Sequence, residues 1–172
     1  MIICVAGCLH GELQKTYDII QEIEKKENYK VDVLLICGDL EFSRNIADLK
    51  CVAKPEHWDI KMRMMAMGTF YKYYSGEMKA PVLTIVVSGN HEASNYLQEM
   101  PFGGWLCPNI YYLGRTGVID LVNEVGHVIL TIGGISGIYK GASYKKEKLE
   151  CPPYNPSTKR TVYHIRKTDI DR

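Results

Sequence analysis

Three apolar runs rich in β-branched residues, at 2–5, 31–37 and 82–87, mark the first half of the chain. Runs of this length and composition are typical of β-strands. The second run is apolar on both faces, which favours a central strand of a parallel sheet. Between the first two runs, residues 12–27 repeat apolar side chains every three or four positions, with Glu and Lys opposite, and this periodicity predicts an amphipathic helix. The pattern predicts an α/β fold.

The second half alternates short elements with turns. A helical pattern at 44–74 is interrupted at Pro55, and no internal repeat is present. Later segments predict a helix at 94–98, a turn at 103–105, a strand at 110–113 and an antiparallel hairpin formed by 118–122 and 127–132. Beyond it, prolines and the loss of periodicity predict a long loop.

Composition narrows the class of protein. The chain has 172 residues, 46% of them hydrophobic and 24% charged, which indicates a globular domain or part of a larger one. No apolar run is long enough to span a membrane, and no secretory signal is evident. The six cysteines form no Cys-x-x-Cys pair, so we expect thiols, mostly buried, in a reducing nuclear or cytosolic compartment.

Charge is unevenly distributed. The formal net charge is only +1, yet residues 140–172 hold nine Lys and Arg against four Asp and Glu. Tyrosines are interspersed with these cations, and cations with aromatic rings suit a nucleic acid. A solvated surface segment explains the same charges equally well.

Metal-binding side chains follow each of the first three predicted strands. Cys8 and His10 follow the first, Asp39 the second, and Asn90 and His91 the third. In an open α/β sheet, ligands bind at the carboxyl ends of the strands. The three strand ends therefore predict one shared metal site.

The residue types suggest individual roles. Cys8 and His10 lie on the same side of an extended backbone and can bind one metal ion. Asp39 can bridge two ions and Asn90 can bind the second, which is the arrangement that promotes in-line displacement at phosphorus. His91 is the natural general acid because imidazole titrates near neutral pH.

Each motif has an ordinary alternative when taken alone. A Gly-Asp pair is usually a turn, a cysteine at a strand end is usually in the core, and Asn90 could be a helix N-cap. The order of the three motifs, each after a strand, favours the metal site.

Taken together, the three motifs resemble the series of the calcineurin-like metallophosphoesterases, with Cys8 in place of the first Asp. The chain is similar to the lariat-debranching family within them, on the strings Thr-Phe-Tyr-Lys-Tyr-Tyr-Ser-Gly at 69–76, Gly-Asn-His-Glu-Ala-Ser-Asn at 89–95, Gly-Gly-Ile-Ser-Gly-Ile-Tyr-Lys at 133–140 and Cys-Pro-Pro-Tyr-Asn at 151–155.

The resemblance implies a metallophosphoesterase-type β-sandwich flanked by helices. It implies hydrolysis of the 2′–5′ phosphodiester at the branch point of intron lariats. A nuclear location, which can extend to the cytoplasm, is expected of such an enzyme. It also implies that Cys8, His10, Asp39 and Asn90 bind two divalent ions, with His91 as general acid. Because thiolate favours softer cations, Fe²⁺, Zn²⁺ or Mn²⁺ is expected.

Three regions are expected along the chain. They are the first part of the catalytic domain at 1–135, a lariat-recognition loop at 136–166 and an end segment at 167–172. Branched RNA is the expected partner, and the residues expected to contact it are Tyr139, Lys140, Tyr144, Tyr154, His164 and Arg166.

One departure from the family stands out. The family supplies three more histidine ligands, in Ser-His-Asp-Trp-Pro and Gly-His-x-His contexts, and neither string occurs here. We therefore expect the C-terminal part of the fold to be absent from this chain, and residues 59–67 to be a small insertion far from the metals. Two alternatives stay open: a non-catalytic RNA-binding fragment, and a metallophosphoesterase acting on other phosphoesters.

Overall fold

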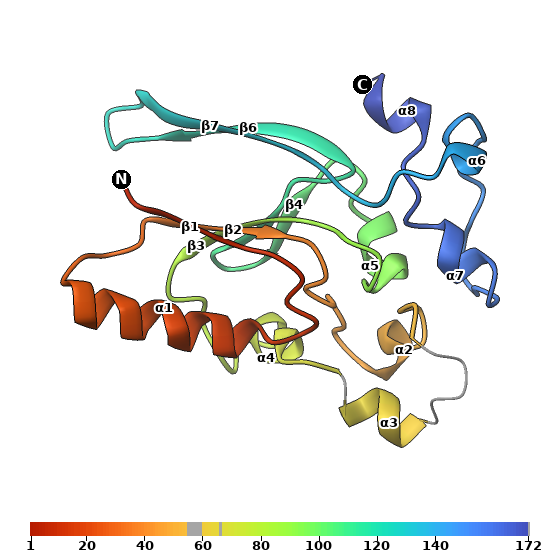
Figure 1. Ribbon diagram of the computed structural model, residues 1–172, viewed down its shortest axis with the longest axis horizontal. Helices are drawn as coiled ribbons and strands as arrows, with labels where there is room; N and C mark the ends of the chain where they lie inside the picture. The colour runs from red at the N-terminus through yellow and green to blue at the C-terminus, as the bar shows by residue number, and fades with distance from the viewer. Residues whose placement is uncertain (55–59, 66, 172) are drawn as a thin grey trace.

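A five-stranded, mostly parallel sheet forms the centre of the computed structural model, which describes residues 1–54, 60–65 and 67–171. Its strand order is β1-β2-β3-β5-β4 (Figure 1). The strands are β1 (Ile3–Ala6), β2 (Val33–Cys37), β3 (Leu83–Val87), β5 (Ile110–Tyr112) and the antiparallel edge strand β4 (Gly104–Cys107). The predicted α/β class is confirmed.

The first three strands end at the same level. In the parallel register Ala6 lies beside Ile36, and Ile36 lies beside Val86. Strand β2 is buried on both faces, with Leu34 and Ile36 on one side and Val33 on the other. The segments that follow these strands therefore emerge together at one edge of the sheet.

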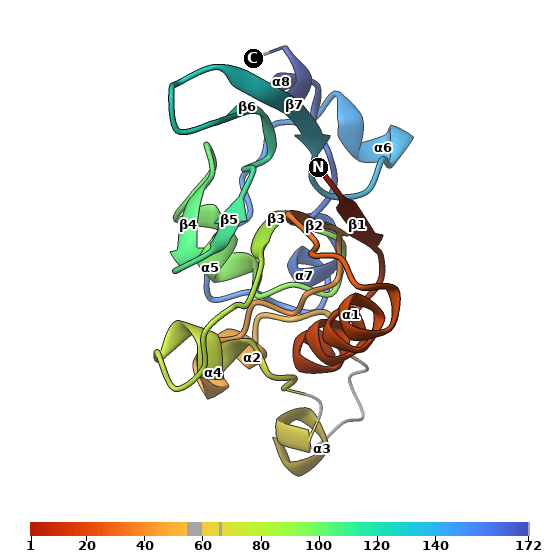
Figure 2. The ribbon, with the colours of Figure 1, turned by 90° about the vertical axis from the view of Figure 1, so that its left-hand side faces the viewer.

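Helices cover one face of the sheet (Figure 2). Helix α1 (Leu13–Glu27) buries Leu13, Tyr17 and Ile20 against it, which confirms the predicted helix, whereas Ile19 and Ile23 are exposed. The short helices are α2 (Ile46–Leu49), α3 (Ile60–Met65), α4 (Phe70–Tyr74) and α5 (Ser94–Gln98).

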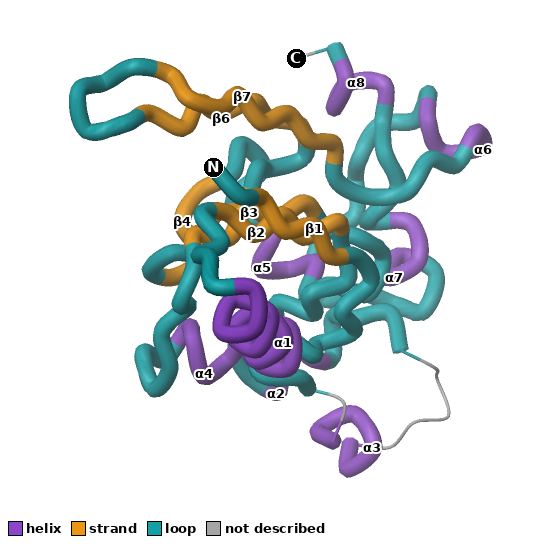
Figure 3. Tube along the Cα trace, turned by 60° about the vertical axis from the view of Figure 1, so that its left-hand side comes forward, coloured by secondary structure: helices purple, strands orange, loops and turns teal. Residues whose placement is uncertain are grey.

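An antiparallel ribbon covers the opposite face (Figure 3). It consists of β6 (Thr116–Val122) and β7 (Val128–Ile135), as the hairpin pattern predicts. Ile132 of the ribbon packs with Val33, Ile85 and Leu113 in a small core between the two layers. The result is a layered arrangement of helices, sheet and ribbon.

The C-terminal segment lies at the end of the molecule where β1, β2 and β3 finish (Figure 1). It holds α6 (Gly141–Tyr144), α7 (Thr158–Thr161) and α8 (Lys167–Ile170), so the loop expectation is wrong in part. A parallel bridge joins Ile138 to His164, and the Gly137 N–H donates to the Ser88 carbonyl oxygen at 2.7 Å. This last bond ties the segment to the end of β3.

Two further expectations are corrected. The predicted turn at 103–105 instead begins strand β4, because Trp105 pairs with Tyr111 across the sheet. Only Cys107 of the six cysteines is buried. The expected insertion at 59–67 includes α3, but positions 59 and 66 lie outside the described residues. None of the helices that the structure describes is long and apolar enough to cross a lipid bilayer.

Candidate metal centre

The turn after β1 presents Cys8 and His10 to solvent. Both residues adopt left-handed backbone conformations, with φ of 52° and 46°. Residues other than glycine rarely adopt this backbone conformation, and those that do are often found at functional sites. Both residues are exposed, so their side chains are available to a ligand.

Asp39 follows β2 and is only 5% exposed. It too is left-handed, with φ of 56°. Its Oδ1 accepts the backbone N–H groups of Asn90 and His91, each at 2.9 Å. A Cβ added at Gly89 would lie 2.2 Å from Asp39 Oδ1, so the loop after β3 can approach this closely only with glycine there.

Cys8, His10 and Asp39 come together as the sequence predicts, but Cys8 and His10 do so from left-handed conformations and not from the extended backbone expected for them. One ligand atom from each residue lies within 4.8 Å of the others. The Oδ2 of Asp39 lies 4.0 Å from His10 Nε2, while the two N–H bonds engage Oδ1. A thiolate sulfur, an imidazole nitrogen and a carboxylate oxygen form a donor set suited to borderline transition-metal ions, so these residues fit a divalent metal. Asn90 lies beside them, joined to Asp39 through its backbone.

His91 lies at the edge of this cluster. Its ring centroid is 5.4 Å from that of His10. Its Nδ1 is 2.8 Å from the carbonyl oxygen of Ala53. A carbonyl oxygen can only accept, so Nδ1 carries a proton and donates. Nε2 is therefore the ring nitrogen that can exchange a proton with a bound molecule.

Glu92 is a structural member of the site that the sequence did not single out. Its carboxylate is buried and accepts the N–H groups of Gly89, Leu40 and Glu41 at 2.9, 3.3 and 2.8 Å. Glu92 thereby joins the loop after β2 to the loop after β3. Burial, reinforced by nearby Asp39, raises the pKa of this carboxyl to about 8. The string Gly-Asn-His-Glu contains it, but periodicity gives no sign of its burial.

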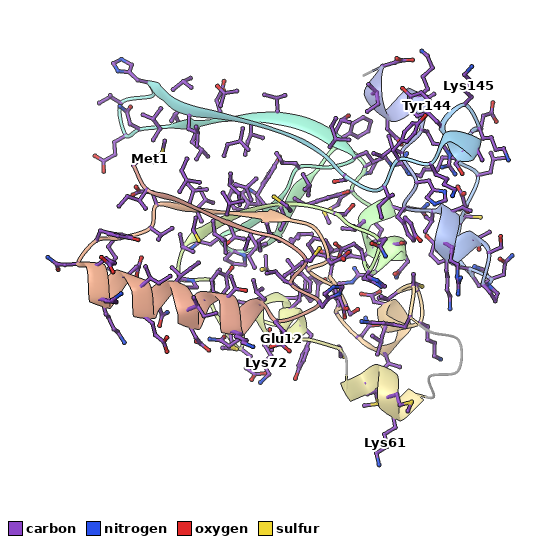
Figure 4. All side chains as sticks on the ribbon, in the orientation of Figure 1. Met1, Glu12, Lys61, Lys72, Tyr144 and Lys145 are labelled. Atoms are coloured by element: carbon purple, nitrogen blue, oxygen red, sulfur yellow. The ribbon has the colours of Figure 1, made fainter. Side chains whose placement is uncertain are left out.

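The residues expected to contact RNA fall into two groups. Tyr139 and Lys140 are exposed just before α6, and Tyr144, which Figure 4 labels, is partly buried at the end of that helix. Tyr139 is 64% exposed, and its ring centroid is 5.4 Å from that of Tyr144. Aromatic rings arranged in this way are available for base stacking.

The other three lie deeper. The Tyr154 hydroxyl donates to Gln98 Oε1 at 2.6 Å, and His164 Nδ1 is 2.9 Å from Ser143 Oγ. Arg166 is 2% exposed and donates to Glu150 Oε1 at 2.7 Å. The structure therefore places Arg166 inside the segment, bonded to Glu150 and to the carbonyl oxygens of His164 and Thr161, and the expected RNA contact of Arg166 is wrong.

A second buried charge cluster fastens the segment to the sheet. Asp169 lies 3.3 Å from Arg115 Nη1 and 3.7 Å from Lys148 Nζ. Burial, together with nearby Arg115, lowers the pKa of Lys148 from 10.5 to about 8. Sequence alone indicated a basic surface here and not a buried network.

Comparison with known proteins agrees with the fold. The family model for the calcineurin-like phosphoesterases matches residues 1–168, and the chain belongs to this family. It is therefore a member of a hydrolase family that uses divalent metal ions.

More specific similarity comes from curated relatives. Lariat debranching enzyme A of Xenopus laevis is 54% identical over 170 residues, which cover 99% of this chain and 30% of that protein. The lariat debranching enzyme of Homo sapiens is 51% identical over 170 residues, covering 99% of this chain and 29% of that protein. For the enzyme of Arabidopsis thaliana the identity is 45% over 172 residues, covering 100% and 38%. The chain thus spans about 30% of the length of the animal relatives.

Proposed function

We propose that this chain carries part of the catalytic centre of an RNA-debranching phosphodiesterase that hydrolyses the 2′–5′ bond of intron lariats. The observation that carries the proposal is the cluster of Cys8, His10 and Asp39, whose ligand atoms lie within 4.8 Å of one another beside His91. The chain is about half identical to lariat debranching enzymes over its length, and this likeness supports branched RNA as the substrate.

Cys8, His10, Asp39 and Asn90 would hold the divalent ions, two being the number that the family resemblance implies. When bound, such ions supply Lewis acidity and neutralise charge on phosphate oxygens. The thiolate of Cys8 favours Fe²⁺, Zn²⁺ or Mn²⁺ over Mg²⁺.

His91 would act as general acid. With Nδ1 donating to the Ala53 carbonyl oxygen, the second proton of the imidazolium form is on Nε2. This proton passes to the departing 2′-oxygen and leaves the neutral ring protonated at Nδ1. Asp39 keeps the backbone of His91 in place through the N–H bond at 2.9 Å. The ring is thus held from both its backbone and its Nδ1 side.

Tyr139, Lys140 and Tyr144 would bind the RNA. Tyr139 and Tyr144 offer ring faces for bases, and Lys140 offers a positive charge for the phosphate backbone. We further propose a nuclear location, where intron lariats are produced; a tagged protein found only outside the nucleus would contradict this.

A synthetic 2′–5′ branched RNA tests the proposal, with a linear 3′–5′ RNA and a phosphopeptide as comparison substrates. The protein should linearise the branched RNA, and His91→Ala should retain its metal content while losing most turnover. Cleavage of the phosphopeptide alone would instead favour a phosphoesterase of other specificity. RNA binding without hydrolysis would favour a non-catalytic role. Loss of metal in His91→Ala would mean that His91 is a ligand.

A further inference from the structure

A buried ion pair lies behind His91. Lys54 Nζ donates to Glu41 Oε1, and the two side chains are 9% and 0% exposed. Removing two charges from water costs much of what their attraction returns, so a buried pair is weak evidence for a role in stability alone. Its connections to the loops around it point to another role.

On one side, the pair controls the turn at Ala53. Val52 is fully buried in the helix-side core. The Lys54 N–H donates to the Val52 carbonyl oxygen at 2.9 Å, which closes a three-residue turn centred on Ala53. Both neighbours of Ala53 are therefore fixed: Val52 is packed in the core, and Lys54 is bound to Glu41. The direction of its carbonyl group is fixed as a result.

That carbonyl is the acceptor for His91 Nδ1, at 2.8 Å. A neutral imidazole can place its proton on either nitrogen, and the partner of one nitrogen decides which. The Ala53 carbonyl selects the form protonated at Nδ1. If the carbonyl moved, both the tautomer and the ring orientation would be released.

On the other side, the pair is joined to the loops of the metal cluster. The Glu41 N–H donates to Glu92 Oε2 at 2.8 Å, and Gly89 N–H donates to the other oxygen of Glu92. Within the described part of the chain, Glu41 Oε2 has no hydrogen-bond partner, and it faces Gly11, 3.5 Å from the position of a Cβ there. Lys54 therefore reaches a carboxylate that is itself fixed to the loops carrying Asp39 and His91.

We propose that Glu41 and Lys54 are positioning residues, which hold the Ala53 carbonyl against Nδ1 of His91 and so keep Nε2 free to exchange a proton with the substrate. The inference deepens the proposed function, on which it rests for the role of His91 as general acid. Neither residue contacts the substrate in this account. Both act through the carbonyl of Ala53.

Nitrogen-15 NMR of the histidine rings tests the inference without reference to turnover. The chain is labelled at histidine and measured at mildly alkaline pH, as purified and with saturating Zn²⁺, and His91→Gln identifies the His91 signals. The Glu41→Gln/Lys54→Met double variant removes both charges together, which avoids leaving one of them buried alone. We expect its ratio of Nδ1–H to Nε2–H at His91 to fall about fivefold, the effect of losing about one hydrogen bond.

Two variants serve as controls. Lys54→Arg keeps the charge and should retain the ratio of the unmodified chain. Lys30→Met breaks an ion pair of 2.8 Å with Glu24 beyond the end of α1 and should leave His91 unchanged. If the double variant does not fold by circular dichroism, Glu41→Leu/Lys54→Met replaces it, since this pair leaves neither a buried charge nor a buried amide.

A folded variant without the ion pair that keeps the original tautomer ratio overturns the inference. This outcome is separate from the failure of the proposed function. If His91→Ala retained full turnover on branched RNA, the general-acid role would fail even with the NMR result as expected. If instead the double variant shifts the tautomer, its turnover on branched RNA should fall in kcat with little change in KM.

Discussion

The candidate metal centre and the C-terminal segment are held in place by different means. Cys8, His10 and Asp39 are fixed by their own backbone, all three in left-handed conformations, and Asp39 is fixed further by two N–H donors. The segment is fixed largely by buried side-chain charges, among them the pair of Arg166 and Glu150. Both lie at the same end of the sheet.

The comparison teaches how each region should fail. A site held by close backbone contacts is sensitive to one added carbon atom, because there is no room for it. A segment held by buried charges is sensitive to the loss of one partner and to pH, because an unpaired charge in the interior is costly.

The largest effect is expected at Gly89. Gly89→Ala places a Cβ 2.2 Å from Asp39 Oδ1, so the two N–H bonds to that oxygen must break. We expect a loss of about 4 kcal/mol in the free energy of unfolding, from overpacking and from lost charge-assisted bonds, together with loss of Zn²⁺ binding. Urea unfolding and calorimetric titration measure these.

Gly7→Ala is the matched control for that variant. Gly7 precedes Cys8 at the end of β1, and an added Cβ would meet only the Cys37 Cβ, at an ordinary 3.8 Å. It should leave Zn²⁺ binding nearly unchanged. Equal losses in the two variants would show that close contact does not explain the site's sensitivity.

Breaking the ion pair in the segment should have a slightly smaller and more local effect. Glu150→Ala leaves Arg166, 2% exposed, without its carboxylate partner. We expect a loss of about 3 kcal/mol. Hydrogen exchange should rise around α6 and α7 while the amides of β2 and β3 stay protected. Glu147→Ala, at an exposed position of the same segment, should change the free energy of unfolding little. If hydrogen exchange in Glu150→Ala rose equally in β2 and β3, the segment and the sheet would not be stabilised separately.

Lys148 should make stability depend on pH at the alkaline side. Its pKa is about 8 in the folded chain and near 10.5 when unfolded, so the unfolded state binds more protons between these values. Stability should therefore rise by about 2 kcal/mol from pH 8 to 10. Lys148→Met should remove this rise in unfolding curves measured across the range. A rise that persists in the variant would assign it to another group.

The smallest effect on stability is expected at Tyr139. Because the side chain is 64% exposed, Tyr139→Ala should change the unfolding free energy by less than about 0.5 kcal/mol. Affinity for branched RNA should nevertheless fall about tenfold if the ring stacks on a base. Fluorescence anisotropy measures this, with Tyr29→Ala, which follows α1, as the control. Equal affinities for the two variants would remove Tyr139 from the RNA-binding surface.

Much of the site could be predicted because its residues follow strands in sequence. The apolar runs identify β1, β2 and β3, and parallel pairing brings their ends together, so Cys8, Asp39 and Asn90 converge without knowledge of distant contacts. The ribbon of β6 and β7 was predictable for a similar reason, since a hairpin pairs neighbours in the chain.

Contacts between distant residues could not be predicted in the same way. Glu92 and Glu41 look like surface acids in the sequence, yet both are buried, because backbone N–H groups and Lys54 supply their partners. Arg166 looked like an RNA contact, but it lies buried against Glu150. Strand β4 begins with a glycine, which indicates a turn in the sequence, and the pairing of Trp105 with Tyr111 is visible only in the structure.

The sequence by itself determined the first three parallel strands, the residue types at their ends and the metal chemistry that those types allow, because each depends on local periodicity and on side-chain identity. Only the tertiary structure decided which oxygen of Asp39 is engaged by N–H groups, that the Ala53 carbonyl holds His91, and which cations are buried. Those features depend on residues far apart in the chain, whose protonation and orientation are set by burial and by the partners that folding brings to them.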